Sequence, residues 1–381
     1  MIFQNKPYIT GTEFRYIQAA IENRHLSGNG KYSKLCHDFF KEKYGFAKCL
    51  LTTSCTDALE MSALLLNIQP GDEVIMPSFT FVSTANAFIL RGASIILADS
   101  AADHPNITAE TIAPLITAKT KALVVVHYAG MACDMDAVME LARKHNVFVV
   151  EDAAQAIDSF YISGTGKKQP LGSIGHLAAF SFHESKNIQC GEGGLLVIND
   201  EQFAKRAEII WEKGTNRAAF FRGEVDKYNW VDIGSSFLPS EITAAFLYAQ
   251  LLALDVIQNE RKRKWQQYYD TLLPLQLQQK LQLPQMPSAA TNNAHIFYVV
   301  CNSLAERDQL ILFLKNNGVQ SMFHYPGLHT SPFYTTTHAI QQLPNAAKFS
   351  ACLLRLPLYV ELAPGEVANI CNLITAFYTP A

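Results

Sequence analysis

Short apolar runs recur between residues 45 and 200, and a turn rich in Ser, Thr, Gly or Asp follows each of them. Helical patterns separate several runs, notably at residues 56–66 and from Asp134, whose side chain can cap a helix start. Buried strands that alternate with helices are typical of a mostly parallel sheet covered on both faces. The runs predicted as strands are KCLLT, DEVIMP, ASIILAD, KALVVVHY, VFVVED, LAAFSF and GLLVIN.

The pattern changes in the rest of the chain. Residues 201–213 and 239–273 have helical periodicity, and a Gln- and Pro-rich stretch follows Pro274. Beyond it come two further strand patterns, AHIFYVVC and VQSMFHY, and helix patterns at residues 305–317 and from Pro364. With 381 residues, the chain is long enough for two domains. We therefore predict an α/β protein with a large domain over residues 1–255, including an N-terminal segment, and a small α+β domain over residues 256–381.

Composition narrows the function classes. The formal net charge is -3, so no overall field recruits nucleic acid or an anionic membrane. The first residues lack the pattern of a signal peptide, and no apolar run is long enough to span a membrane. The eight cysteines show neither CxxC nor paired Cys/His spacing, which argues against a zinc site and a disulfide framework. We predict a soluble, cytoplasmic protein without a metal.

Polar and aromatic residues gather where the predicted strands end. In a mostly parallel sheet, ligands bind beyond the carboxyl ends of the strands. A helix start at this edge offers backbone N–H groups that suit a phosphate. The residues that follow these strands are Ser54, Cys55 and Thr56 at a helix start, Phe81, Asp152 with Gln155, and Ser181 with Lys186.

This set matches the needs of pyridoxal phosphate. The cofactor's aldehyde forms a Schiff base with a lysine, and its phosphate needs N–H and hydroxyl donors. Its ring nitrogen stays protonated beside an anion, which Asp152 can supply, while Gln155 can donate to the ring oxygen. Phe81 can stack on the ring. The prediction rests on the order and spacing of Lys186 and these residues together.

Each of these residues also has a plainer interpretation. Asp152 could be a helix N-cap, Phe81 could belong to the core, and residues 54–56 could open a helix without binding a phosphate. The GEGG run at residues 191–194 does not fit the dinucleotide-binding pattern G-x-G-x-x-G, and we interpret it as a turn before a strand.

The combined motifs TSCTDALE, MPSFTFVSTANAF, EDAAQ, SFHESKN and GEGG resemble those of the DegT/DnrJ family of sugar aminotransferases. The resemblance covers nearly the whole chain and implies the aspartate-aminotransferase type of fold, fold type I. It implies that Lys186 holds the cofactor, Asp152 pairs with the ring nitrogen and Gln155 meets the ring oxygen. The phosphate would be held by backbone groups at residues 54–56 and by the Ser181 hydroxyl.

The resemblance also implies a homodimer with shared active sites, in which an Asn that is typical of the family reaches the cofactor phosphate in the partner subunit. Here Ser236 stands at that position, and its hydroxyl could still donate. Residues 69–93 and 212–236 are most similar to family members that aminate TDP-4-keto-6-deoxyglucose at C4, with L-glutamate as donor. Candidate contacts to the sugar nucleotide are Lys213, Arg217, Arg222, His324 and His329; a solvated surface for the cations and structural roles for the histidines remain open.

Other activities stay open in this interpretation. The amine could enter at C3 of a keto sugar, or the chain could be a non-catalytic regulator that binds pyridoxal phosphate. A sugar dehydratase of the same fold lacks the lysine, so Lys186 argues against it. A cysteine desulfurase would need a catalytic cysteine loop in the small domain, for which the sequence gives no clear sign.

Overall fold

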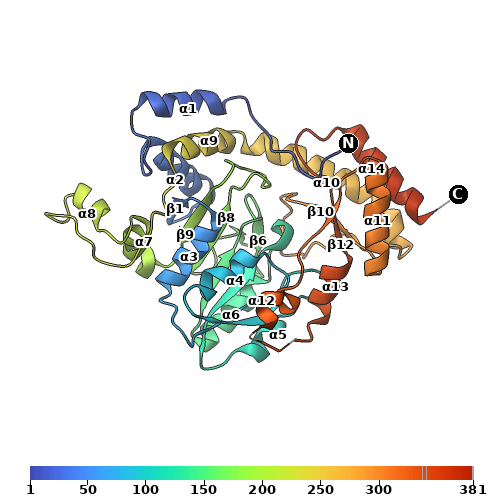
Figure 1. Cartoon of the computed structure of the whole chain (residues 1–381), viewed down its shortest axis with the longest axis horizontal. Helices are drawn as coiled ribbons and strands as arrows, with labels where there is room; N and C mark the ends of the chain where they lie inside the picture. Colours follow the sequence, from blue (N-terminus) through green and yellow to red (C-terminus); the bar gives the residue numbers. More distant parts are fainter. Residues whose placement is uncertain (337, 340, 380–381) are drawn as a thin grey trace.

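The structure is a computed structural model that describes residues 1–336, 338–339 and 341–379. A seven-stranded sheet of order β1-β9-β8-β5-β4-β2-β3 lies at its centre (Figure 1). Strand β9 alone runs against the others, because it pairs antiparallel with both β1 and β8. The predicted mostly parallel sheet is confirmed. Its strands are β1 (Lys48–Thr52), β2 (Glu73–Pro77), β3 (Ser94–Ala98), β4 (Thr120–Val126), β5 (Phe148–Asp152), β8 (Leu177–Ser181) and β9 (Gly194–Ile198).

Helices cover both faces of this sheet, since alternate residues of a buried strand point to opposite sides. In β4, Leu123 and Val125 belong to the core on one face, and Ala122 and Val124 belong to the core on the other. The first core is completed by α2 (Lys31–Tyr44), α6 (Met135–His145) and α9 (Glu241–Leu252), and the second by α3 (Cys55–Leu65), α4 (Val82–Ile89) and α7 (Ala204–Trp211). As predicted, the Asp134 side chain caps α6.

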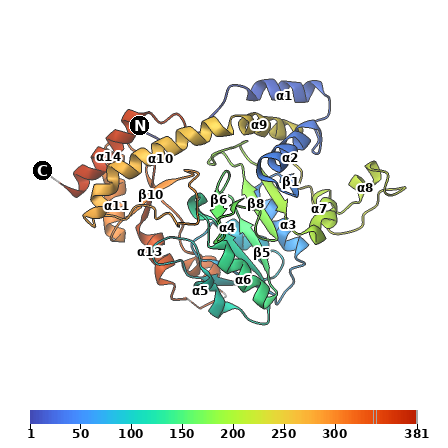
Figure 2. The same ribbon diagram turned by 180° about the vertical axis from the view of Figure 1, so that it is seen from behind.

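A third core surrounds a three-stranded antiparallel sheet of order β10-β12-β11. Helix α10 (Leu254–Leu277) runs from the central sheet to this smaller one in both views (Figures 1 and 2). The predicted boundary between residues 255 and 256 falls in its first turn, and the division into two domains stays a prediction. The other elements here are β10 (Phe297–Val300), β11 (Met322–Phe323), β12 (Leu353–Leu356), α11 (Leu304–Asn316), α13 (Pro344–Cys352) and α14 (Pro364–Tyr378).

Residues 213–236, which we call the arm, extend from the body beside α7 (Figures 1 and 2). The arm contains only one short helix, α8 (Arg217–Phe221), and exposes Phe221, Tyr228 and Trp230. The remaining helices and strands are α1 (Glu13–Glu22), α5 (Ala109–Ile112), α12 (Pro332–Thr335), β6 (Phe160–Ile162) and β7 (Lys168–Pro170), with short 3-10 turns at 113–115, 128–130, 201–203 and 328–330.

All eight cysteines are free, and six of them are buried. Within the described residues, no single helix is both long and apolar enough to cross a membrane; the pair α9 and α10 passes that test only jointly, with a 60° bend between them. The predicted cytoplasmic location stays a prediction.

Candidate active site

A cavity of about 480 Å³ lies at the carboxyl edge of the central sheet. One wall comes from residues that follow β1, β2, β5 and β8, as the sequence predicted. The facing wall comes from the chain leading into β10 and from β12, and includes His295 and Arg355. Gln4 also lines the cavity, and its Nε2 donates to the carbonyl oxygen of Leu356 at 3.1 Å. The site therefore lies between the central sheet and the smaller sheet.

The helix start after β1 offers free donors to an anion. Ser54 caps α3, its hydroxyl accepting the N–H of Asp57 at 3.1 Å. The N–H groups of Cys55 and Thr56 have no acceptor among the residues that the structure describes. A Cβ atom at Gly194 would lie 2.3 Å from the carbonyl oxygen of Ser54, so only glycine lets β9 approach so closely. The last glycine of GEGG thus shapes this helix start.

Lys186 lies in the loop between β8 and β9, and its side chain lines the cavity. Its backbone N–H donates to the carbonyl oxygen of His183 at 2.9 Å. Burial lowers the pKa of the Lys186 amine, while the nearby Asp152 acts in the opposite direction. A lowered pKa increases the share of neutral amine, which is the form that attacks a carbonyl or accepts a proton. Ser181, at the end of β8, lines the same cavity.

Asp152 ends β5, and its carboxylate is held from two sides. Oδ2 accepts the hydroxyl of Thr84 at 2.8 Å, and Oδ1 accepts the N–H of Ala154 at 3.2 Å. Burial raises the pKa of the Asp152 carboxyl, whereas these hydrogen bonds and Lys186 act to lower it. A cation placed beside this carboxylate would favour its ionised form. The protonated nitrogen of a pyridine ring is such a cation.

Gln155 and Phe81 complete this wall. The Oε1 atom of Gln155 accepts the N–H of Ala129 at 2.6 Å, and its Nε2 donates to the Tyr325 hydroxyl at 3.1 Å. Phe81 caps α4 and is 55% exposed, so it is not a core residue. Its ring lines the cavity, with its centroid 6.0 Å from that of Tyr325.

Arg355, which the sequence analysis missed, lies in β12 and lines the cavity. Its Nε is buried and has no hydrogen-bond partner within the described residues. Burial lowers the pKa of this guanidinium, and the nearby Tyr128 and Tyr325 act in the opposite direction. A partly buried cation that pairs with no carboxylate within the described residues suits an anionic ligand. A single arginine within the apolar run LLRLPL was the signal in the sequence.

Of the remaining predicted residues, His324 lines the cavity, and its Nδ1 lies 2.8 Å from the Tyr128 hydroxyl. The structure does not bring the others into the cavity of this chain. His329 is buried against Ser78, with Nδ1 to Oγ at 2.6 Å. Arg222 pairs with Glu208 and Glu224. Four predicted residues lie on the arm, are exposed and do not line the cavity, so their roles stay predictions: Lys213, Arg217, Arg222 and Ser236.

These groups fit pyridoxal phosphate. The helix start and Ser181 would hold the phosphate, Asp152 the ring nitrogen, Gln155 the ring oxygen, and Lys186 the aldehyde carbon. When bound, the cofactor supplies an electron sink for a carbanion on the substrate. No group of three or more metal-ligating side chains occurs in the part of the chain that the structure describes. The fold and the site define a fold type I enzyme dependent on pyridoxal phosphate.

The chain belongs to the DegT/DnrJ/EryC1/StrS aminotransferase family, whose model matches residues 7–375. It is thus a sugar aminotransferase. Among solved structures, the aminotransferase TlmJ from Streptoalloteichus hindustanus is 28% identical, with a TM-score of 0.89 over 99% of this chain and 98% of that one. DesV from S. venezuelae, solved with a ketimine intermediate, is also 28% identical, with a TM-score of 0.88 over 97% and 95% of the two chains.

The fold is also shared with the PLP-form of Spr1654 from Streptococcus pneumoniae, a putative sugar aminotransferase. That chain is 24% identical, with a TM-score of 0.88 over 98% of this chain and 97% of its own.

Proposed function

We propose that the enzyme transfers the amino group of L-glutamate to the C4 ketone of TDP-4-keto-6-deoxy-D-glucose. The product would be TDP-4-amino-4,6-dideoxy-D-galactose, a precursor for surface polysaccharide such as lipopolysaccharide or enterobacterial common antigen. The observation that carries the transamination is the placement of Lys186, Asp152 and Arg355 around one cavity. The choice of sugar is supported by the resemblance of residues 69–93 and 212–236 to C4 aminotransferases.

Lys186 would move the proton in both half-reactions. Its Nζ would accept the proton released from the α-carbon of glutamate and hold it for donation in the following step, a general acid-base role worth roughly 10²- to 10⁴-fold. Arg355 would hold a carboxylate of glutamate, because its guanidinium lines the cavity and pairs with no carboxylate within the described residues. His324 would contact the sugar from the same wall.

The substrate can be tested in two separate steps. The enzyme is first loaded with the amino group of glutamate, and the 2-oxo acid that forms is removed. The loaded enzyme is then offered a panel of TDP- and UDP-linked 3-keto and 4-keto sugars. We expect amine transfer to the TDP-4-keto sugar, with galacto stereochemistry read by NMR. Transfer only to a 3-keto sugar would show a C3 aminotransferase and contradict this proposal. No transfer to any sugar would favour the alternative of a non-catalytic regulator that binds pyridoxal phosphate.

We further propose that two chains form a homodimer in which the arm of one reaches the site of the other. The exposed apolar residues Phe221, Tyr228 and Trp230 support an arm that packs against a second copy. Arg222 would then leave its ion pairs with Glu208 and Glu224 and pair with the diphosphate of the sugar nucleotide. Ser236 would donate a hydrogen bond to the phosphate of the cofactor in the partner subunit.

For Arg222→Ala, we expect sugar-nucleotide turnover to fall by about tenfold while the glutamate half-reaction is retained, because glutamate carries no diphosphate. Mixing these chains with Lys186→Ala chains should raise activity well above the mean of the two parents. In such a hybrid, one of the two sites has both residues intact. No recovery after verified chain exchange, or an equal fall in both half-reactions, would contradict the shared site.

A further inference from the structure

Asn187, the residue directly after the lysine, is buried and makes three hydrogen bonds. Its Nδ2 donates to Gln258 Oε1 on α10 at 2.7 Å and to the carbonyl oxygen of Asn293 at 2.8 Å. Its Oδ1 pairs with Nδ1 of His295 at 2.8 Å. The loop that carries Lys186 is therefore joined to α10 and to the segment 293–296, which leads into β10.

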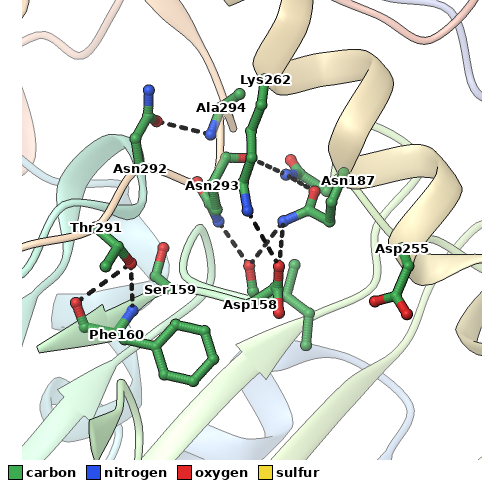
Figure 3. A network of polar contacts seen from close by, with 12 residues as sticks. Asp158, Ser159, Phe160, Asn187, Asp255, Lys262, Thr291, Asn292, Asn293 and Ala294 are labelled. Atoms are coloured by element: carbon green, nitrogen blue, oxygen red, sulfur yellow. Dashed lines mark hydrogen bonds and ion pairs between the residues drawn. The ribbon is translucent and has the colours of Figure 1, made fainter. Parts of the chain in front are cut away.

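Asn293 joins the same segment to the loop that follows β5. Its Nδ2 donates to the carbonyl oxygens of Gln155 and Ile157, each at 2.8 Å. Figure 3 shows Asn187 and Asn293 close together, between α10 and the turn at Asp158. The loops after β5 and β8 thus converge on one buried amide pair, behind the cavity wall that carries Gln155 and Lys186.

Helix α10 holds the segment 293–296 in place. Arg261 donates to the carbonyl oxygens of Ala294 at 3.0 Å and of His295 at 2.5 Å. One helical turn further on, Trp265 donates to the carbonyl oxygen of Ile296 at 3.1 Å. These donors are buried, so the segment is a rigid support for the residues that bond to it.

The bonds of Asn187 also determine where the proton of His295 lies. A backbone carbonyl can only accept a hydrogen bond, so the side-chain group of Asn187 that faces the Asn293 carbonyl is the amide nitrogen. The oxygen of Asn187 then faces Nδ1 of His295, which must carry a hydrogen in order to donate. Burial lowers the pKa of His295 well below its ordinary value, with Lys186 and Arg261 acting in the same direction. This lowered pKa favours the neutral ring, in which Nε2 is an acceptor.

We infer that Asn187 is a positioning residue with two tasks: it holds the loop of Lys186 against the segment 293–296, and it fixes His295 in the tautomer whose Nε2 accepts hydrogen bonds. His295 lines the cavity, and its Nε2 makes no hydrogen bond within the described residues. It can therefore accept an N–H or O–H of a bound molecule. The inference depends on Lys186 as the cofactor lysine, which the Lys186→Ala experiment below tests separately.

The first test measures how fast Lys186 reaches the cofactor. Cofactor-free enzyme is mixed with pyridoxal phosphate, and the growth of the visible band is followed by stopped flow. For Asn187→Ala we expect the band to form about 10- to 100-fold more slowly, because the amine is no longer held in line with the aldehyde. The cofactor should still bind through its phosphate, as measured by quenching of protein fluorescence.

Gln250→Ala is the matched control. It removes another buried amide, which donates to the carbonyl oxygen of Tyr8 at 2.9 Å and to Glu13 at 2.7 Å and does not line the cavity. It should lower the melting temperature and leave the rate of band formation unchanged. An unchanged rate in Asn187→Ala, or an equally slow rate in Gln250→Ala, would overturn the positioning role of Asn187.

The second test observes the tautomer by ¹⁵N NMR of histidine-labelled protein, with His295→Asn used to assign the signal. The wild type should carry the proton on Nδ1 of His295. Asn187→Asp keeps an oxygen facing His295 but loses both donor bonds, so we expect a protonated Nδ1 together with slow band formation. A neutral His295 with its proton on Nε2 in the wild type would overturn the second task.

Discussion

Replacing Lys186 by alanine is expected to abolish transamination, with a fall of about 10⁴-fold or more, because the variant would lose both the amine that we propose to bind the aldehyde and the base that we propose to move the proton. The wild type should be yellow when loaded, and borohydride should fix the cofactor to Lys186, as located by peptide mass spectrometry. The variant should retain part of its affinity for the cofactor through the N–H groups of Cys55 and Thr56.

Lys205→Ala is a suitable control, because Lys205 is exposed and does not line the cavity. It should keep the visible band and full activity. Label on a lysine other than Lys186, or a wild type that stays colourless when saturated with pyridoxal phosphate, would refute the assignment of Lys186.

Asp152→Asn is expected to slow both half-reactions by about 10²- to 10³-fold, because we propose that this carboxylate is the anion that keeps the ring nitrogen protonated. Asparagine retains the shape and can still accept a hydrogen bond from Thr84. The loss should appear equally in single turnovers with glutamate and with the keto sugar, in contrast to Arg222→Ala.

The neighbouring Glu151 provides a control for the loss of a buried carboxylate. It is fully buried and accepts the N–H groups of Gly172, Ile174 and Gly175 at 2.7, 2.8 and 2.6 Å. Glu151→Gln should lower the melting temperature while the visible band is retained. If it slows single turnovers as much as Asp152→Asn does, the charge of Asp152 has no special part in the chemistry.

The strands of the central sheet could be predicted from the sequence because each is a short apolar run bounded by turn residues. DEVIMP became β2 (Glu73–Pro77), and GLLVIN became β9 (Gly194–Ile198). The reversed direction of β9 could not be predicted, since the pattern of a buried strand is the same in both directions. Strand β12 was missed because an arginine interrupts its short apolar run and a proline directly follows its last residue.

The residues that line one wall of the cavity could be predicted to lie together because they follow strands that end at one edge. The facing wall could not be predicted, because Arg355 and His295 come from distant parts of the chain and meet Lys186 only when the smaller sheet packs against the larger one. Asn187 stood beside the lysine in SFHESKN, but its partners Gln258 and Asn293 are not adjacent in sequence. The positive charges of the arm could be found in the sequence, whereas the pairing of Arg222 with Glu208 and Glu224 could not.

The buried cysteines make thiol chemistry a reporter of local unfolding. Burial raises the pKa of all eight thiols, those of Cys49, Cys301 and Cys371 to about 12, so few thiolates exist in the folded chain near neutral pH. Cys49 belongs to a core of the central sheet, and Cys301 and Cys371 belong to the core of the smaller sheet. The order in which an alkylating reagent reaches them would therefore reveal which of the two sheets opens first, and whether a bound cofactor delays the opening of both.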